Sequence, residues 1–344
     1  MEKFKRLLEE YDYKISPEII AQKPASPRDS AKLLVYKKKE DKVFYDTFVN
    51  LAKYLPADAV LVFNQTKVLP ARLMVKKETG GKAEILYVEM AEGNMKVLAD
   101  RFLPVASKVY LTPKLHFLVM SHRGKYYLLK PCFPVKNIFE ILEKYGSTPI
   151  PPYIKHSPLS EKQLKKEYQA IFAKIRGSIA APTASLHFTD RLLKKIKKFG
   201  AAVKFVTLHV GLGTFSPLTE ENIKTGKLHS EYYEIDKKTA DFLKKAKKQG
   251  RPIIAVGTTV VRTLESVFSA GGMKKLSGPT DLFIKSGYKF NFVNGVITNF
   301  HVPKSSLLML ASAFVGKKKL FEIYKKAMAK KFRFFSFGDG MLIY

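Results

Sequence analysis

The hydrophobic pattern changes twice along this chain, and that change limits the possible folds more than any other feature. Over residues 82–130, apolar residues alternate with polar ones in short runs, as in antiparallel strands with one buried face. The runs cover residues 82–88, 94–99, 108–111, 115–120 and 125–130, and the last two flank a Ser-His-Arg-Gly turn. This segment predicts a small antiparallel β unit.

On both sides of that unit, apolar strands alternate with helical stretches. Strand candidates cover residues 59–63, 203–210 and 253–256, and helix candidates cover residues 190–199 and 239–248. Such alternation is typical of layered α/β domains. We predict an α/β/α main domain formed by residues 1–67 and 149–344, with an inserted antiparallel, barrel-like β domain at residues 68–148. Pro149, Pro151 and Pro152 mark the second boundary, because proline disfavours both helices and central strands.

Composition narrows the class of protein further. With 344 residues, 46% of them hydrophobic, the chain is long enough for about two domains with an ordinary core. A lone cysteine, Cys132, excludes internal disulfides and the common zinc fingers, and no histidine pair has helical ligand spacing, so we expect no bound metal. The first ten residues lack an apolar signal core, and no apolar run reaches the roughly 18 residues of a membrane span. We therefore expect a cytoplasmic protein without a membrane partner.

The formal net charge of +31 points to a polyanionic partner, with nucleic acid as the natural candidate. The alternative is that lysine, which far outnumbers arginine, simply covers solvated faces. The few arginines are then the more informative cations, because guanidinium grips carboxylates and phosphates with two parallel donors. Those in motif-like segments are Arg28, Arg72, Arg262 and Arg333.

One segment, residues 177–189, combines small residues, hydroxyls and His187 in a mixture too polar for a core and too apolar for a linker. It is typical of the wall of a binding site. Similarly dense segments surround His209, Thr258, His301 and Arg333. We therefore predict one site assembled from distant parts of the chain.

The segment 253–262 predicts a buried strand that runs through a glycine into a helix capped by Thr258 or Thr259. The start of a helix suits an anionic or polar ligand group, and Arg262 lies one turn further on. The alternative is an ordinary capped helix whose arginine bridges to a neighbour. Segment 209–215 contains Gly-x-Gly but lacks the third glycine of a dinucleotide fingerprint, and His229-Ser230-Glu231 lacks the Pro-Cys-x-x-Cys half of a zinc deaminase.

Near the end of the chain, residues 298–303 follow a strand and residues 333–340 mix aromatics with Arg333 and Asp339. Aromatic rings beside an arginine suit a stacked base or a cation, although each phenylalanine there is as readily explained as core. Asp339 between two glycines is harder to explain as core. A carboxylate at that place suits ribose hydroxyls.

In these residues, the chain resembles the S-adenosylmethionine:tRNA ribosyltransferase-isomerases of queuosine biosynthesis. The resemblance spans nearly the whole chain. The matching motifs are residues 11–13, 20–22, 28–29, 63–64, 70–73, 151–154, 168–169, 180–183, 186–189, 209–215, 255–266, 280–284, 298–301 and 333–342. The departures are Gln65 for the usual Asp, Ser185 for Gly, Asn294 for a frequent Asp and Gly340 for Ala.

This resemblance implies that S-adenosylmethionine gives its ribosyl portion to 7-aminomethyl-7-deazaguanine at the tRNA wobble position, forming epoxyqueuosine and releasing adenine and methionine. Such chemistry needs a base that removes a proton from the carbon beside the sulfonium and an acid or hydrogen bond for the departing adenine. It also needs a site from which water is excluded. The partners implied are tRNA and S-adenosylmethionine, with no other cofactor, and a monomer is expected. By chemical type, the catalytic candidates are His187, His209, Glu231 and His301. The candidates for binding S-adenosylmethionine are Thr183, Thr214, Thr258, Arg262, Asp281, Asn299, Arg333 and Asp339, and those for binding tRNA are Arg72, Tyr168 and Gln169.

Two other functions stay open at this point. One is a non-catalytic RNA-binding protein on the same scaffold, which the charge and Ser185 favour. The other is an enzyme that acts on a nucleoside not attached to tRNA. Binding of S-adenosylmethionine tests the first alternative, and a comparison of tRNA with the free base as acceptor tests the second.

Overall fold

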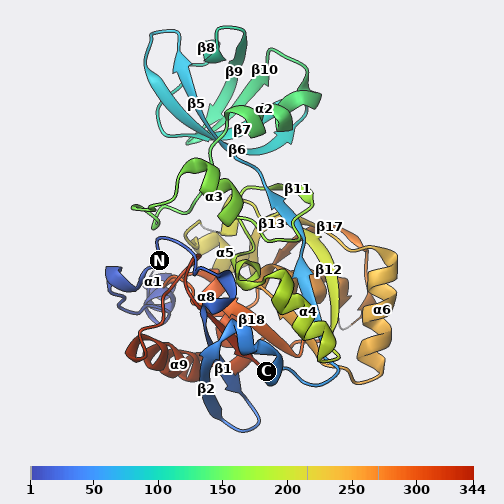
Figure 1. Ribbon diagram of the computed structural model, residues 1–344. Helices are drawn as coiled ribbons and strands as arrows, with labels where there is room; N and C mark the ends of the chain where they lie inside the picture. Colours follow the sequence, from blue (N-terminus) through green and yellow to red (C-terminus); the bar gives the residue numbers. More distant parts are fainter. Residues whose placement is uncertain (1, 215, 270) are drawn as a thin grey trace.

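A nine-stranded mixed sheet forms the centre of the larger domain in this computed structural model (Figure 1), which describes residues 2–214, 216–269 and 271–344. In spatial order its strands are β17 (Ser277–Leu282), β13 (Lys227–Glu234), β12 (Ala202–Leu208), β3 (Val60–Asn64), β14 (Ile253–Val256), β18 (Gly295–Asn299), β19 (Gly340–Ile343), β1 (Lys32–Lys37) and β2 (Lys42–Thr47). The central strands β12, β3, β14 and β18 are mutually parallel. Their carboxyl ends therefore meet at one edge of the sheet.

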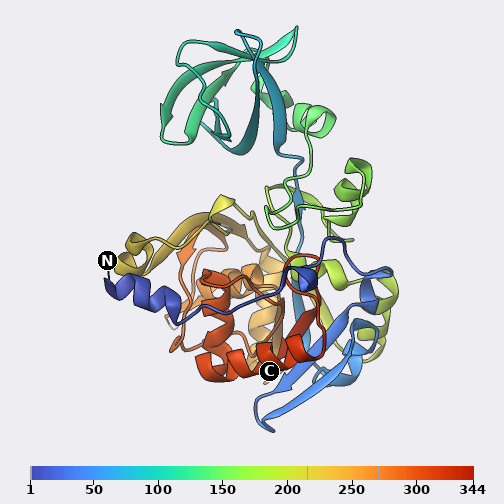
Figure 2. The same ribbon diagram turned by 90° about the vertical axis from the view of Figure 1, so that its left-hand side faces the viewer.

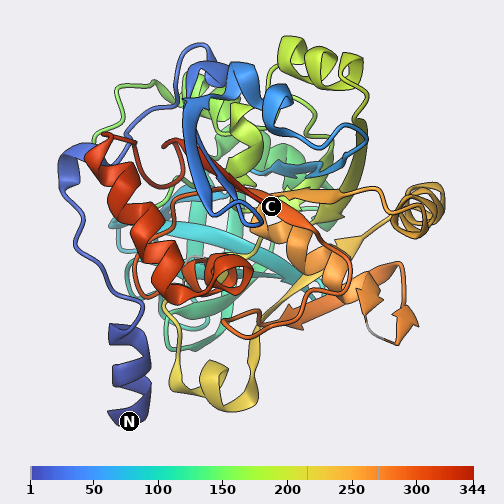
Figure 3. The same ribbon diagram turned by 90° about the horizontal axis from the view of Figure 1, so that it is seen from below.

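Helices cover both faces of this sheet, as the view from below shows (Figure 3). Alternation within β1 explains why: Leu34 and Tyr36 join one core, whereas Leu33 and Val35 join the other. The first core packs against α6 (Lys237–Lys248), α7 (Thr258–Val267), α8 (Ser306–Val315) and α9 (Lys317–Ala329), and the second packs against α4 (Asp190–Lys198) and the 3₁₀ helix η3 (Phe48–Tyr54). The predicted layered α/β/α class is confirmed.

The second domain is a closed six-stranded antiparallel barrel, which stands apart from the sheet domain (Figure 2). Its strands, in order around the barrel, are β10 (Tyr126–Pro131), β7 (Asn94–Ala99), β6 (Lys82–Ala91), β5 (Arg72–Lys77), β8 (Lys108–Thr112) and β9 (Leu115–Arg123). The sequence pattern missed β5, because exposed Met74 hides the alternation of buried Leu73 and Val75. The barrel lies inside the predicted segment 68–148, whose exact limits stay a prediction.

Shorter elements complete the chain. The parallel pair β4 (Thr66–Val68) and β11 (Ile175–Ser178) lies between the two domains, and β15 (Phe268–Ser269) pairs with β16 (Gly272–Met273). The remaining helices are α1 (Glu2–Glu9), α2 (Ile138–Tyr145), α3 (Glu161–Glu167), α5 (Glu220–Thr225), η1 (Pro17–Ile19), η2 (Arg28–Ser30), η4 (Val135–Asn137), η5 (Thr183–His187) and η6 (Leu212–Thr214). Within the described ranges, the search for a helix long and apolar enough to span a membrane finds none.

Candidate active site

A pocket opens where the parallel strands end, at the edge of the sheet that carries the barrel. It encloses about 600 Å³, including the solvent at its mouth. In α/β sheets this edge is the usual place for a ligand. The polar groups on its wall come from Tyr153, Thr183, Thr258, Thr259, Thr298, Asn299, His301 and Ser336. No aspartate, glutamate, lysine or arginine lies among the described residues of this wall. We call this space the donor pocket.

The start of helix α7 forms one side of the donor pocket. Gly257, with φ +96°, ends β14 and turns the chain into the helix. The N-cap is Gly257 and makes no side-chain cap, so the prediction that Thr258 or Thr259 caps the helix was wrong. The positive φ needed for the turn favours glycine, which moves both threonines into the first helical turn. The positive end of the helix nevertheless lies at the pocket wall, as predicted.

Asn299, at the end of β18, connects the pocket wall to the layer behind it. Its Oδ1 accepts a hydrogen bond of 2.9 Å from Thr183, and its Nδ2 donates to the Phe335 carbonyl at 3.2 Å. Nδ2 also lies 3.2 Å from Nε2 of His187. One amide side chain therefore joins the end of β18 to two other segments, η5 and the loop that contains Phe335.

His187 lies in that second layer, outside the donor pocket wall. It is 4% exposed and stacks on Phe48 with ring centroids 4.1 Å apart. Burial, aided by the positive charges of Arg333 and Arg28, lowers the pKa of His187 to about 3. The imidazole is therefore neutral, and because Nε2 accepts from Asn299 its proton is on Nδ1. This geometry lets His187 act through Asn299.

His301 is the candidate histidine that lines the donor pocket itself. Its Nε2 lies 2.9 Å from Oγ1 of Thr298, and its backbone N–H donates to the hydroxyl of Tyr324 at 2.9 Å. Burial lowers its pKa to about 3, so it too is neutral at pH 7. A neutral imidazole can accept a proton or donate a hydrogen bond to a ligand here.

His209, at the end of β12, faces the cleft between the sheet domain and the barrel. Its Nδ1 lies 3.0 Å from Oγ1 of Thr66, which lies 2.7 Å from Oγ of Ser178, and that oxygen accepts from the N–H of Val210 at 2.8 Å. The hydroxyl of Thr66 can also donate to the carbonyl of Ile175 at 3.4 Å. His209 therefore belongs to a chain of hydroxyls that joins β4, β11 and the end of β12. Burial lowers its pKa, and the charge of Glu234 opposes that shift in part.

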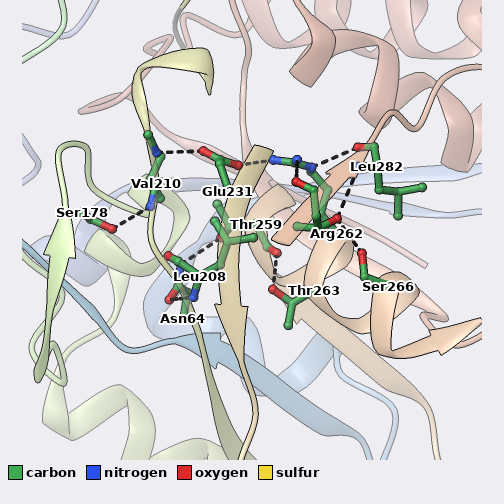
Figure 4. A network of polar contacts seen from close by, with 12 residues as sticks. Asn64, Ser178, Leu208, Val210, Glu231, Thr259, Arg262, Thr263, Ser266 and Leu282 are labelled. Atoms are coloured by element: carbon green, nitrogen blue, oxygen red, sulfur yellow. Dashed lines mark hydrogen bonds and ion pairs between the residues drawn. The ribbon is translucent and has the colours of Figure 1, made fainter. Parts of the chain in front are cut away.

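Glu231 and Arg262 form a buried ion pair at the centre of a hydrogen-bond network (Figure 4). Glu231 accepts from the N–H of Gly211 at 2.9 Å, and Arg262 donates to the carbonyls of Leu282 and Thr280 at 3.1 Å each. The alternative of a helical arginine that bridges to a neighbour is therefore what the structure shows. Both side chains also line a small second pocket that shares Leu307 with the donor pocket.

The other charged candidates for binding S-adenosylmethionine lie outside the donor pocket wall. Asp339 accepts from the N–H groups of Arg333 at 2.7 Å and Lys32 at 3.1 Å, and from the Arg333 guanidinium at 3.1 Å. These bonds close the loop that places Phe335 in the pocket wall. Asp281 is a surface residue that pairs with Lys227 at 2.9 Å. The side chain of Thr214 lies outside the described part of the chain.

The residues predicted to contact tRNA lie at the junction of the two domains. Arg72 pairs with Glu84 and bonds to the carbonyl of Ile150 at 3.4 Å. Gln169 holds both backbone groups of Val68, with bonds of 3.0 and 2.7 Å. Tyr168 is 1% exposed. Apart from the Arg72–Glu84 pair inside the barrel, these contacts hold the junction together, and a role of the three residues in binding RNA stays a prediction.

Tyr153 and Ser336 belong to the pocket but were not among the predicted site residues. Their hydroxyl oxygens lie 2.6 Å apart, and burial raises the pKa of Tyr153 to about 12. The signal was present in the family motif at residues 151–154. It was interpreted as a hinge because of its prolines.

Comparison with known proteins identifies the family. The sequence profile described as queuosine biosynthesis protein matches residues 8–343. The chain belongs to this family. A relative from Carboxydothermus hydrogenoformans, named S-adenosylmethionine:tRNA ribosyltransferase-isomerase, is 45% identical over 98% of this chain and 99% of its own length. One of the same name from Thermotoga maritima is 41% identical over 97% of this chain and 98% of its own.

A solved structure agrees with the assignment to the queuosine biosynthesis family. The crystal structure titled S-adenosylmethionine tRNA ribosyltransferase from Thermotoga maritima is 33% identical and aligns over 97% of this chain and 100% of its own, with a TM-score of 0.57. The resemblance found in the sequence is thereby confirmed. The chain is an enzyme of this family, and the comparisons do not support the alternative of a non-catalytic RNA-binding protein.

All four departures from the family motif lie in buried or hydrogen-bonded positions. Asn294 accepts from the N–H of Ile253 at 3.0 Å and supports the sheet. A Cβ on Gly340 would come within 2.9 Å of Phe48, the ring on which His187 stacks. Ser185 is fully buried, and its hydroxyl has no hydrogen-bond partner among the described residues.

The fourth departure, Gln65, is held by its own contacts. Its Nε2 donates to Oγ1 of Thr207 at 3.3 Å, and its backbone N–H donates to Val206 at 2.9 Å. Gln65 is absent from the donor pocket wall. None of the four departures therefore introduces a charge into that pocket.

Proposed function

We propose that this enzyme transfers and isomerises the ribosyl moiety of S-adenosylmethionine onto 7-aminomethyl-7-deazaguanine at the tRNA wobble position. The products are epoxyqueuosine in tRNA, adenine and methionine. The observation that carries the proposal is the donor pocket, whose wall of hydroxyls, one amide and a neutral imidazole suits a nucleoside. The full-length relatives named for this reaction support the same assignment.

The second pocket suits the amino-acid end of the donor. Arg262 and Glu231 line it side by side, so a carboxylate and an ammonium group each meet an opposite charge there. It adjoins the donor pocket at Leu307. We assign the adenosine part of S-adenosylmethionine to the donor pocket and its methionine part to the second pocket.

We assign the catalytic hydrogen bond at the donor to His301, the histidine on the pocket wall. Burial lowers its pKa to about 3, which makes the neutral imidazole a weak base, so we assign it the hydrogen bond to the departing adenine and not removal of the proton beside the sulfonium. A buried pocket keeps water away from that step. Thr183, Thr258 and Asn299 hold the donor by hydrogen bonds. His187 is a positioning residue that acts through Asn299. Asp281, Arg333 and Asp339 take no part in this proposal, because they are absent from the walls of both pockets.

S-adenosylmethionine is proposed as the single small-molecule substrate, with no further cofactor. The enzyme is proposed to act as a monomer in the cytoplasm, where its tRNA substrate is found. The net charge of +31 supports capture of that polyanion.

The test is adenine release from S-adenosylmethionine, with and without tRNA that carries the 7-aminomethyl-7-deazaguanine wobble base. We expect release that requires this tRNA, with a matching mass gain on the modified nucleoside. No release despite tight tRNA binding would contradict the proposal and point to Gln65 and Ser185 as damaging departures. Equal release with the free base would instead favour the alternative acceptor that is not attached to tRNA.

A further inference from the structure

We infer that the cleft between the barrel and the sheet domain binds the unpaired loop of the RNA acceptor, and that the barrel supplies half of this binding surface. This inference rests on the proposed function for the identity of the RNA. The cleft has aromatic and basic side chains on both sides: Tyr126 and Lys96 from the barrel, and Tyr232, His209 and Arg176 from the sheet domain and the junction. The barrel otherwise has no assigned role.

Two aromatic side chains of the cleft are exposed. Tyr232 is 49% exposed on β13, and Tyr126 is 37% exposed on β10. The ring of Tyr232 lies nearly parallel to that of His209, with an interplanar angle of 16° and centroids 6.5 Å apart. Exposed rings beside lysine and arginine side chains are surfaces on which unstacked bases of single-stranded RNA pack.

The cationic side chains of the cleft can exchange their carboxylate partners for RNA phosphates. Lys96 pairs with Glu89 at 2.8 Å and lies 5.4 Å from the ring centroid of Tyr126, while Arg176 pairs with Glu143 at 3.0 Å. All four of these side chains are at least 35% exposed, and exposed pairs contribute little to stability. Glu231, also on the cleft wall, is neutralised by Arg262.

The cleft shares one wall with the donor pocket and the second pocket. Residues 209–213 all line the cleft, Val210 also lines the donor pocket, and Gly213 also lines the second pocket. The buried bonds from Ser178 to Val210 and from Glu231 to Gly211 hold this wall in place (Figure 4). A base held in the cleft thus lies next to the pocket from which the ribosyl group comes.

The experiment measures binding of a synthetic anticodon stem-loop RNA with the 7-aminomethyl-7-deazaguanine wobble base, by fluorescence anisotropy without S-adenosylmethionine. The variants are Tyr232→Ala, Tyr126→Ala, Lys96→Ala and Arg176→Ala. The matched controls are Tyr45→Ala, an equally exposed tyrosine on edge strand β2 at the far side of the sheet, and Lys114→Ala in the turn between β8 and β9. Thermal unfolding checks that every variant is folded.

We expect each tyrosine variant in the cleft to weaken stem-loop binding about tenfold. Lys96→Ala and Arg176→Ala should weaken it less and each lower the salt slope by about 1. The controls should bind as the unmodified protein does. Cleft variants that bind like the controls, or an unmodified protein that does not bind the stem-loop, would overturn the inference.

This outcome is separable from that of the proposed reaction. Stem-loop binding that depends on the cleft, without adenine release, supports the cleft and contradicts the reaction. Adenine release that is unchanged by all four cleft variants supports the reaction and contradicts the cleft.

Discussion

The donor pocket and the interdomain cleft lie on opposite sides of one short segment, yet their chemistry is opposite. The pocket is buried, and its wall carries hydroxyls, an amide and a histidine that burial keeps neutral. The cleft is open and carries exposed tyrosines, Lys96 and Arg176. A nucleoside gains from a dry wall of matched hydrogen bonds, whereas an RNA loop gains from stacking surfaces and mobile cations. The comparison teaches that one site serves chemistry and the other serves capture.

The largest effect is expected at His187, where a substitution should impair turnover in the donor pocket but leave RNA binding in the cleft intact. His187→Ala removes the partner of Asn299 in the second layer, so we expect adenine release to fall by at least about a thousandfold while stem-loop affinity stays within a few fold. Paired turnover and anisotropy measurements check this. The exposed His156→Ala is the matched control. Unchanged turnover in His187→Ala would demote His187 to a packing residue.

The ion pair of Glu231 and Arg262 lies behind the wall that both sites share, so breaking it should damage both. Arg262→Met leaves a buried carboxylate without its partner and should lower the free energy of unfolding by about 3–5 kcal/mol. Urea unfolding measures this. The double variant Glu231→Gln with Arg262→Met should recover part of the loss. A single variant as stable as the unmodified protein would show that the pair is not needed to hold the wall.

Lowering the pH should reduce the stability of the protein, because His187 and His301 are buried as neutral imidazoles at the donor pocket. The folded pKa of His187 and that of His301 are both about 3, below the ordinary value of 6.5, so both stabilise the fold above pH 6.5 and lose that contribution as pH falls toward 3. Below pH 6.5, each histidine should lower the free energy of unfolding by about 1.4 kcal/mol per pH unit, and the two together should lower it by about 4 kcal/mol at pH 5. Urea unfolding from pH 7 to pH 5 tests this. His301→Asn should halve the slope, and an unchanged slope would contradict the assignment.

Gly177 tests the cleft side of the wall. A Cβ on this glycine, with φ +151°, would lie 2.6 Å from the ring of His209. Gly177→Ala should displace that ring and lower turnover with tRNA roughly tenfold to a hundredfold, at unchanged affinity for S-adenosylmethionine. Steady-state kinetics and calorimetry measure the two quantities. Gly226→Ala, at an open turn with positive φ, is the matched control. Equal kinetics for both variants would show that the position of the His209 ring does not affect turnover.

The smallest expected effect concerns Ser185, the buried hydroxyl without a partner. Ser185→Ala removes an unsatisfied polar atom and should raise the free energy of unfolding by about 1 kcal/mol. Turnover should not change, because Ser185 is absent from the pocket wall. Thermal unfolding measures the shift. A loss of stability would mean that the hydroxyl has a partner, such as a bound water.

Much of the site was visible in the sequence because its residues occupy ends of strands that the pattern marks clearly. Asn299 and His209 each follow an apolar strand, and parallel strands bring such ends together. The roles of the charged residues were harder to predict from the sequence. Arg333 and Asp339 are six positions apart and satisfy each other, which no pattern of single residues reveals.

By itself, the sequence determined the two architectures and the family, because hydrophobic period and ordered motifs are local properties of the chain. Only the tertiary structure decided which histidine faces a ligand. The sequence does not distinguish the roles of His187, His209 and His301. In the structure, His187 stacks on Phe48 behind the pocket wall, His209 faces the cleft and His301 lines the donor pocket. The physical reason is that burial and hydrogen-bond partners come from residues as far as 143 positions away, as between Thr66 and His209.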